Sequence, residues 1–224
     1  MDKAKKRKLT IIITSAVVGS LILAIAIPFT IFGIKSARID NDYSYLLEEN
    51  RVTTKKIEGV PLVKQDISCG YAIIEMLSDY YGNKVTEEDL FEKNNHSVST
   101  QTTKGFVDEI NNSIQGLDYV SYEYLTNDEL LMKINDSLKK NRPVAVEFAA
   151  QFEDEWTLHW SIVTGMDKDK IYLNNPYGYK EEISYSEFIG RTTFQSFENM
   201  PIFFHFGFAF GLFSKNTIII SNLE

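Results

Sequence analysis

The sequence predicts an α+β domain that follows one membrane-spanning helix. Residues 9–34 contain no charged side chain, which is typical of a segment that crosses a lipid bilayer. Between residues 69 and 139 apolar residues recur mainly at helical spacing, whereas strand-like runs dominate from residue 144 onward. Helices followed by strands indicate an α+β plan with an antiparallel sheet.

The apolar run of residues 9–34 is long enough to cross a bilayer. At about 1.5 Å per residue, a helix of this length exceeds the roughly 30 Å hydrocarbon core. A cleaved signal peptide is the alternative, because it also begins with basic residues, but its apolar stretch usually spans only about 7–15 residues. Residues 35–37 form only a weak cleavage site. We therefore expect an uncleaved helix, with a basic tail at residues 1–8 and a polar linker at residues 35–56.

Charge is distributed unevenly along the chain. The formal net charge is −8; residues 1–8 hold five bases and one acid, which gives +4, so the remainder carries −12. Bases before an apolar span favour a cytoplasmic N-terminus, which places everything after residue 34 outside. The acidic remainder excludes nucleic acid as a partner, because phosphate neutralisation needs clustered bases. The single cysteine excludes an internal disulfide.

The helices of the domain have recognisable starts and ends. Residues 69–81 carry apolar side chains at helical spacing, and Gly82 is a natural stop. Two pairs of residues have the spacing of a capping box that heads a helix. These pairs are Thr86 with Asp89 and Thr126 with Glu129, and a further helix is expected at residues 104–114.

The second half of the domain is expected to supply the sheet. Strands are predicted at residues 119–124, 144–148, 158–165, 170–173 and 181–184, with a short helix at residues 186–189. A phenylalanine-rich run follows at residues 201–220. Its apolar part, residues 201–213, is too short to cross a membrane. We expect this run to form core strands, so that residues 57–224 make one domain.

Three short stretches carry residues that are capable of catalysis. Cys69 begins a helix, where the helix dipole and free backbone N–H groups favour the reactive thiolate. His159 lies near the start of a predicted strand, and Asn175 lies in the turn Asn-Pro-Tyr-Gly after the next strand. Each also has an ordinary structural explanation: a core cysteine, a hydrogen-bonded strand histidine and a turn asparagine.

The order of these stretches resembles the peptidase C39-like family. Gln65 stands four residues before Cys69, His159 follows on a strand, and Asn175 follows after the next strand, within residues 57–189. The resemblance implies a papain-like fold, in which a cysteine on a helix faces a histidine on a sheet. The family usually has Asp-Pro-x-Gly in the turn. Asn175 therefore departs from its pattern and agrees with papain-type enzymes instead.

The resemblance also implies roles for these residues in a cysteine peptidase that cleaves peptide or isopeptide bonds. Cys69 would be the nucleophile and His159 its base, while Asn175 would orient the imidazole. The Gln65 side chain would form an oxyanion hole with the Cys69 backbone N–H. The partners would be a peptide or protein substrate and the membrane. Acyl or aminoacyl transfer at the same site, or a catalytically silent binding domain, are the alternatives.

The remaining candidate residues indicate no metal and no cofactor. His96 lies in a polar stretch and His205 among phenylalanines, and neither has partners at metal-ligand spacing. No glycine-rich phosphate loop is present. Trp156 and Trp160 flank His159, and core packing is expected for them, with a wall of the substrate cleft as the alternative.

Overall fold

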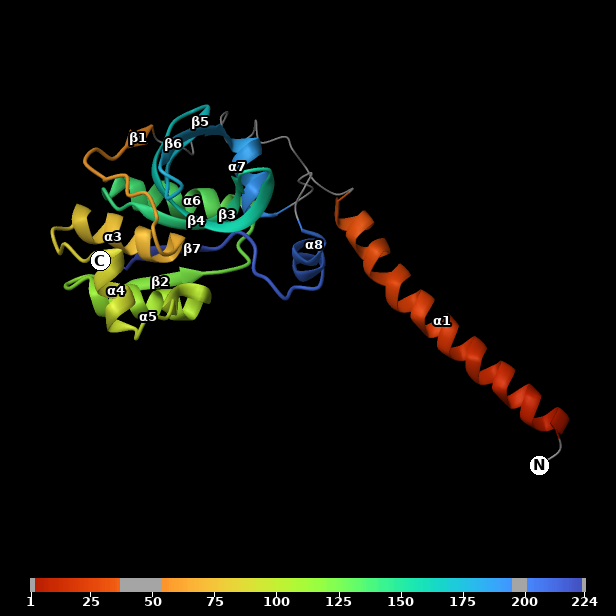
Figure 1. Cartoon of the computed structure of the whole chain (residues 1–224). Coiled ribbons are helices and arrows are strands. Elements are labelled where there is room, and N and C mark those ends of the chain that lie inside the picture. The colour runs from red at the N-terminus through yellow and green to blue at the C-terminus, as the bar shows by residue number, and fades with distance from the viewer. Residues whose placement is uncertain (1–2, 37–53, 195–200, 223–224) are drawn as a thin grey trace. The chain divides into compact units, whose positions relative to one another are not determined.

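The structure, a computed structural model, describes residues 3–36, 54–194 and 201–222 (Figure 1). The chain divides into two compact units. One comprises Met1–Ile39 and Ile202–Phe213, and the other comprises Asp40–Pro201 and Ser214–Glu224. Each unit is therefore built from two separate stretches of sequence.

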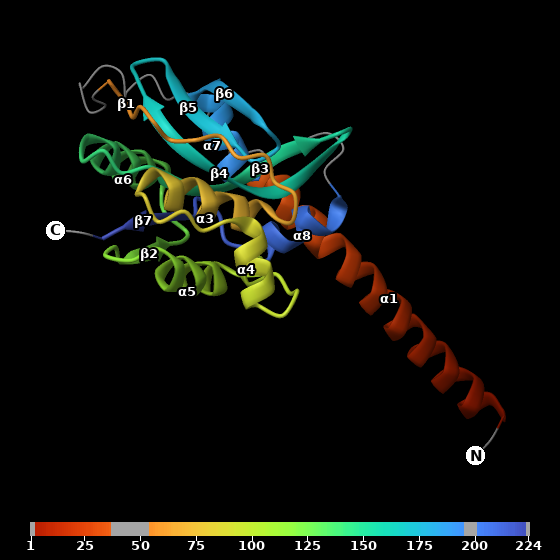
Figure 2. The ribbon, with the colours of Figure 1, turned by 60° about the vertical axis from the view of Figure 1, so that its left-hand side comes forward.

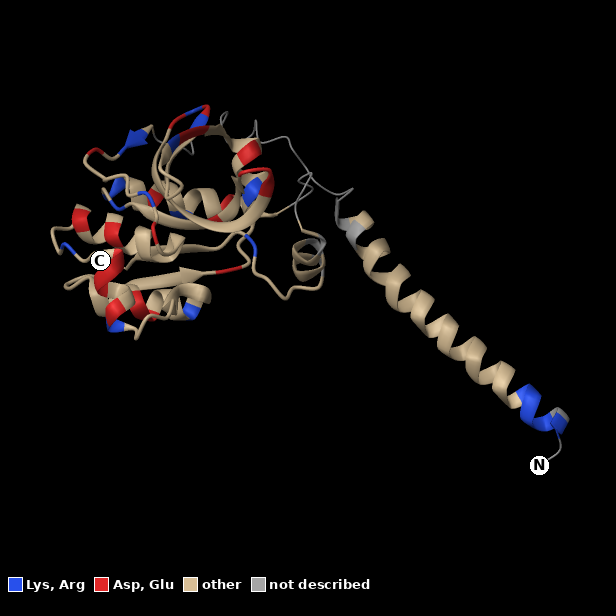
Figure 3. Ribbon diagram, in the orientation of Figure 1, with Lys and Arg blue, Asp and Glu red and all other residues tan. Residues whose placement is uncertain are grey.

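The first unit is dominated by α1, a single helix from Lys3 to Ser36. Its 34 residues, at about 1.5 Å each, measure about 51 Å. Basic side chains gather at its N-terminal end, and the long apolar stretch that follows carries no charge (Figure 3). Within the described part of the chain, this is the one helix long and apolar enough to cross a membrane, through Lys5–Ile31. A signal sequence would meet the same criteria.

The phenylalanine-rich run corrects one sequence-based prediction. Core strands were expected, but residues Ile202–Ala209 form helix α8, and the edge-to-face rings of Phe206 and Phe29 join it to α1. The prediction failed because a short run that is apolar on every side has no period with which to tell a helix from a strand. Only its end behaves as predicted, since β7 covers Ile218–Ser221. The side chain of His205 lies outside the described residues.

The second unit is built on an antiparallel sheet with the strand order β2-β7-β3-β4-β5-β6 (Figure 2). A short strand, β1, pairs with β4 outside this path. The longest pairing joins β3 to β4. The strands are β1 (Lys55–Lys56), β2 (Tyr119–Tyr122), β3 (Val144–Phe152), β4 (Glu155–Met166), β5 (Lys170–Asn175), β6 (Tyr179–Ser184) and β7. The predicted α+β fold with an antiparallel sheet is confirmed.

Helices pack against this sheet, with α3 and α6 on β4 and with α7 on β3, β5 and β6. Both predicted capping boxes are present, at the starts of α4 and α6. Most residues of α3 from Gly70 to Ser78 are buried, so this helix lies at the centre of the hydrophobic core. The helices are α3 (Cys69–Tyr80), α4 (Glu87–Lys93), η1 (Ser99–Gln101), α5 (Thr103–Ser113), α6 (Asn127–Lys139) and α7 (Tyr185–Thr192).

Candidate active site

Cys69 is the first residue of α3, the central helix of the second unit. Ser68 caps this helix, because its side chain accepts a hydrogen bond from the backbone N–H of Tyr71. Glycine at position 70 allows Thr100 of η1 to approach the backbone of α3 next to Cys69. A Cβ at this position would lie 2.2 Å from Oγ1 of Thr100, so no larger residue fits without displacing η1. The start of α3 is therefore held at both its cap and its first turn.

The segment before Cys69 is held by one carboxylate. Glu87, the first residue of α4, accepts hydrogen bonds from the backbone N–H groups of three successive residues, each at 3.0 Å. These residues are Asp66, Ile67 and Ser68. A carboxylate that accepts several backbone N–H groups fixes the path of the chain strongly, because hydrogen bonds to a charged group are the strong ones. Glu87 thus sets the chain path between Gln65 and Cys69.

Gln65 itself is tied to the turn that follows β5. Its backbone N–H donates to the carbonyl oxygen of Pro176 at 2.7 Å, one residue after Asn175. Its side-chain Oε1 is buried and has no hydrogen-bond partner among the described residues. A buried, unpartnered amide oxygen is costly, and such an atom calls for a functional or structural explanation.

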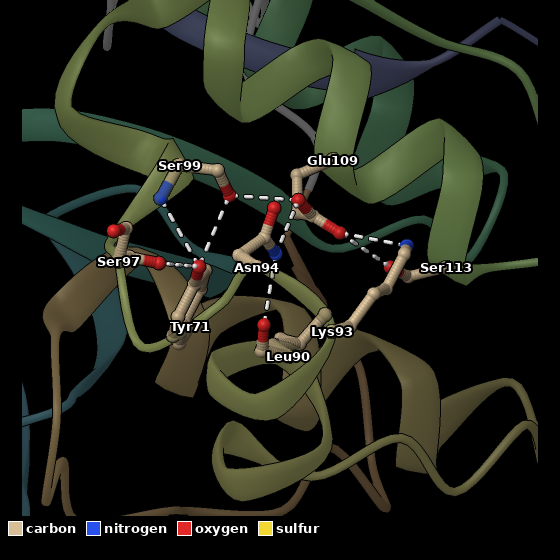
Figure 4. Close-up of polar contacts among 8 residues, drawn as sticks. All are labelled: Tyr71, Leu90, Lys93, Asn94, Ser97, Ser99, Glu109 and Ser113. Carbon is tan, nitrogen blue, oxygen red and sulfur yellow. Dashed lines mark hydrogen bonds and ion pairs between the residues drawn. The ribbon is translucent and has the colours of Figure 1, made fainter.

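A polar network that includes Tyr71 of α3 and Glu109 of α5 links these two helices (Figure 4). The Tyr71 hydroxyl donates to the Ser97 carbonyl oxygen at 2.8 Å and accepts from the Ser99 N–H at 3.0 Å. Glu109 of α5 accepts from the Ser99 hydroxyl at 2.7 Å. Its other donors are Lys93, Asn94 and Ser113. His96 lies in this loop, exposed, 3.6 Å from a carboxylate oxygen of Glu92, which agrees with a solvated loop position.

His159 and Asn175 lie together in the interior of the second unit. Nε2 of His159 is 2.9 Å from Oδ1 of Asn175, and both side chains are buried. The same Oδ1 accepts the Tyr177 backbone N–H at 2.9 Å, while Nδ2 of Asn175 donates to Glu181 at 2.7 Å. Since Oδ1 can only accept, Nε2 must carry the proton, which leaves the lone pair on Nδ1. Asn174 points elsewhere, to the carbonyl oxygens of residues 60 and 61.

Glu181 accepts a hydrogen bond from Asn175 and pairs with Arg191, and neither residue was predicted from the sequence. Arg191 on α7 donates to the second carboxylate oxygen of Glu181 at 2.6 Å, and both side chains are about nine-tenths buried. The Arg191 guanidinium also lies over the rings of Phe148 and Trp156. Glu181 stands in a charged run that is typical of an exposed strand, so only the folded chain brings it to Asn175.

The two tryptophans beside His159 have packing roles. Trp160 is buried, with its ring edge-to-face with Phe106 at 4.9 Å between centroids. Trp156 packs on the Arg191 guanidinium. The ring of Tyr177 stacks on the His159 imidazole at 4.0 Å between centroids. Tyr177, rather than either tryptophan, covers one face of the histidine.

Helix α3 packs against β4, the strand that carries His159. β4 pairs with β5 only from Ile162 onward, so the part that carries His159 is paired on the β3 side alone. The backbone at Trp160, the residue after His159, is one of the groups that lower the pKa of the Cys69 thiol. Among the residues that the structure describes, no hydrogen bond joins that sulfur to the imidazole. Cys69 and His159 thus lie on two elements that pack together, α3 and β4.

Burial is the largest cause of the pKa shifts of both groups. It raises the pKa of the Cys69 thiol above its ordinary value, and hydrogen bonds from the backbone at Trp160 and Gly70 offset this only in part. Burial also lowers the pKa of His159 to about 4. The low thiol pKa expected at a helix start is therefore wrong for this conformation, because desolvation of the sulfur outweighs the backbone N–H groups. Both shifts favour the uncharged forms, the thiol of Cys69 and the neutral imidazole of His159.

The second unit therefore combines a cysteine at the start of a central helix with a strand histidine that is hydrogen-bonded to an asparagine. The sequence profile of the Peptidase_C39 like family matches residues 57–201. The chain belongs to this family of cysteine peptidases. No match was found among curated proteins.

Three solved structures of C39-type peptidases match this chain over most of its length. A C39-like peptidase from Bacillus anthracis is 14% identical with a TM-score of 0.50, covering 77% of this chain and 98% of its own. A double glycine motif protease from an AMS/PCAT transporter, solved with the leader peptide, is 18% identical with a TM-score of 0.49, covering 76% and 95%. The peptidase domain of Streptococcus ComA, a bifunctional ABC transporter, is 15% identical with a TM-score of 0.49, covering 74% and 100%.

Proposed function

We propose that this chain is a membrane-anchored peptidase that cleaves peptide or isopeptide bonds outside the cytoplasm, through Cys69, His159 and Asn175. The observation that carries the proposal is the bond between Nε2 of His159 and Oδ1 of Asn175. It leaves Nδ1 as the basic nitrogen of a buried imidazole on β4, the strand against which the helix that begins at Cys69 packs. A base with a fixed tautomer beside a thiol is what nucleophilic catalysis by cysteine requires.

The reaction begins from the neutral pair. As the Cys69 sulfur attacks the substrate carbonyl carbon, its proton passes to Nδ1 of His159, and the carbonyl oxygen takes up the negative charge. The backbone N–H of Cys69 and the side-chain amide of Gln65 stabilise that oxygen. The imidazolium then gives its proton to the leaving amine, and a thioester remains on Cys69. Water, deprotonated by His159, hydrolyses the thioester and regenerates the thiol.

Gln65, Asn175 and Glu181 prepare this sequence of steps. Oε1 of Gln65 has no hydrogen-bond partner among the described residues, so rotation of the side-chain amide breaks no bond at this atom. Rotation becomes favourable once a substrate oxygen accepts a hydrogen bond from Nε2. Glu181 acts as a positioning residue, because it accepts from Nδ2 of Asn175 and so keeps Oδ1 turned toward the imidazole. Imidazolium formation in a buried site also gains from the accepting Oδ1 atom.

Covalent labelling tests the catalytic proposal. Cys69, the only cysteine, should react with a peptidyl electrophile that places a carbonyl against the sulfur, and intact mass should rise by one adduct. His159→Ala should lower the labelling rate at pH 7 by about 10²-fold or more, because the neutral thiol then has no base. Iodoacetamide on the urea-unfolded chain serves as the control for thiol content. Equal labelling rates for the peptidyl electrophile in both proteins would contradict the proposed pair.

Protease protection tests the proposed location. The basic residues before the apolar span of α1 favour a cytoplasmic N-terminus, so the catalytic unit should be digested when protease is added to intact spheroplasts. A tag fused before Met1 should survive, and full-length chain should fractionate with the membrane. A soluble product that starts near Arg38 would identify a signal peptide, and a protected catalytic unit would identify the inverted orientation.

A further inference from the structure

The segment Pro201–Phe213, named here the phenylalanine segment, has no place in the proposed catalytic machinery. Its one ionisable side chain is that of His205, and Figure 3 shows α8 without acidic or basic colour. Three of its large apolar side chains are strongly exposed: Phe203 by 57%, Phe210 by 48% and Leu212 by 77%. Its six phenylalanines are Phe203, Phe204, Phe206, Phe208, Phe210 and Phe213. So much exposed aromatic surface in one short stretch marks a contact site rather than an ordinary solvated loop.

The chain turns back on itself at the end of α8 and gives the segment a compact shape. The backbone N–H of Leu212 donates to the carbonyl oxygen of Gly207 at 2.7 Å. A Cβ at Gly207 would lie 2.1 Å from the Phe213 ring, so glycine permits this ring to pack directly on the helix backbone. Phe204 and Phe208 lie against the same Phe213 ring. These contacts leave Phe203, Phe210 and Leu212 on the outside.

The partner on one side of the segment is α1. Phe206 meets Phe29 edge-to-face, with 5.2 Å between ring centroids. Phe29 lies two residues before the end of the apolar span Lys5–Ile31, or about 3 Å along the helix axis. The segment therefore sits beside the C-terminal end of the apolar span, which is the level of a membrane boundary if α1 spans a bilayer.

Length and composition decide what covers the exposed side chains. An eight-residue helix is about 12 Å long and cannot cross a bilayer. The segment groups with α1 and not with the sheet that holds the core of the second unit. Lys215, two residues after the segment, is exposed, and a basic side chain so close in sequence suits attachment to a lipid surface. A short, highly apolar helix at the end of a membrane span fits the boundary between headgroups and acyl chains.

We propose that the phenylalanine segment is a second membrane attachment, which inserts Phe203, Phe210 and Leu212 into the outer leaflet beside α1. This inference rests on the proposed role of α1 as the anchor. Ser214, the next residue, already belongs to the catalytic unit, so insertion would tie that unit to the membrane at a second point of the chain. The substrate class narrows accordingly to peptides or protein segments that are presented at the membrane surface.

Fluorescence of a probe at position 210 tests the proposal. In the full-length chain with Cys69→Ala, Phe210→Cys supplies a single thiol for a nitrobenzoxadiazole label, and the protein is reconstituted into phosphatidylcholine vesicles. We expect blue-shifted emission that is quenched more by lipids carrying the nitroxide at acyl carbon 5 than at carbon 12. Met132→Cys is the matched water-exposed control, because Met132 is 51% exposed on α6, in the second unit.

The outcomes separate this inference from the anchor itself. A probe at Leu21→Cys in α1 should be quenched more by the carbon 12 nitroxide, which reports the span. If that probe is quenched and position 210 is not, the second attachment is refuted while the anchor stands. Blue-shifted emission at 210 without quenching would refute it in favour of contact with protein, such as a second copy. If neither probe is quenched, the anchor has failed. Phe203→Cys repeats the test should Phe210→Cys fail to reconstitute.

Discussion

Cys69→Ala and His159→Ala are each expected to lower kcat/KM for a cleaved peptide by about 10⁴-fold or more, because each removes a partner without which the other cannot act. The double variant should be no slower than either single variant. Asn175→Ala should cost less, within the roughly 10²–10⁴-fold that a well-placed general base contributes. Steady-state kinetics on one substrate, with wild type and the four variants in the same detergent, measures the series.

The matched control for this series is a buried polar residue of the same strand. Ser161 on β4 is buried, and its hydroxyl has no partner among the described residues, so Ser161→Ala should change kcat/KM little. Independent losses for Cys69 and His159 that multiply in the double variant would contradict a shared proton transfer. Retained activity in Cys69→Ala would remove the nucleophile from the proposal altogether.

Glu181→Gln extends the same series to the residue behind Asn175. The new amide must face two donors, Nδ2 of Asn175 and the Arg191 guanidinium, so one donor always meets an N–H₂ group. Asn175 can then turn its own N–H₂ toward His159, which would place the imidazole proton on Nδ1. The expected result is a lower kcat with little change in KM. Glu182→Gln, an exposed neighbour on β6, is the control.

Local signals explain which parts of the structure could be predicted. The capping boxes at Thr86 and Thr126, and the helix that begins at Cys69, follow from residues within a few positions of each other. Strand positions followed from apolar patterning, although β4 begins at Glu155, earlier than expected. His159 and Asn175 could be paired because a family pattern joined them across 16 residues.

Local signals of this kind could not predict contacts between distant parts of the chain. Glu87 holds residues 66–68 from about 20 positions away, and nothing in its own neighbourhood distinguishes it from Glu88. Arg191 reaches Glu181 only because α7 folds onto the sheet. The raised pKa of Cys69 has the same origin, since desolvation depends on all the groups that bury the sulfur. Patterning predicts elements, whereas charge states and hydrogen-bond networks require the assembled fold.

Glu147→Gln is expected to change how stability depends on pH. Glu147 lies on β3, almost fully buried, and burial raises the pKa of its carboxyl to about 8 from an ordinary value of 4.5. Between those two values the folded chain binds a proton that the unfolded chain has released, so stability falls as pH rises from about 4.5 to about 8. At 1.36 kcal/mol per pKa unit, the full loss is about 5 kcal/mol.

His159 contributes in the opposite direction over a lower range of pH. Its pKa falls from 6.5 to about 4 on folding, so the unfolded chain binds the extra proton and stability rises between these values. That gain is about 3 kcal/mol by the same conversion. The two contributions largely cancel below pH 6.5. The decline between pH 6.5 and pH 8 should therefore belong to Glu147.

Urea unfolding followed by the fluorescence of Trp156 and Trp160 measures this decline, because both report on the second unit. Wild type should lose about 2 kcal/mol between pH 6.5 and pH 8, at 1.36 kcal/mol per pKa unit. Glu147→Gln should be level over that range and more stable than wild type at pH 8. Glu153→Gln, in the exposed turn between β3 and β4, controls for the change in net charge. A Glu147→Gln protein that loses stability in parallel with wild type would show that this carboxyl is ionised in the folded chain, and the decline would then need another titrating group.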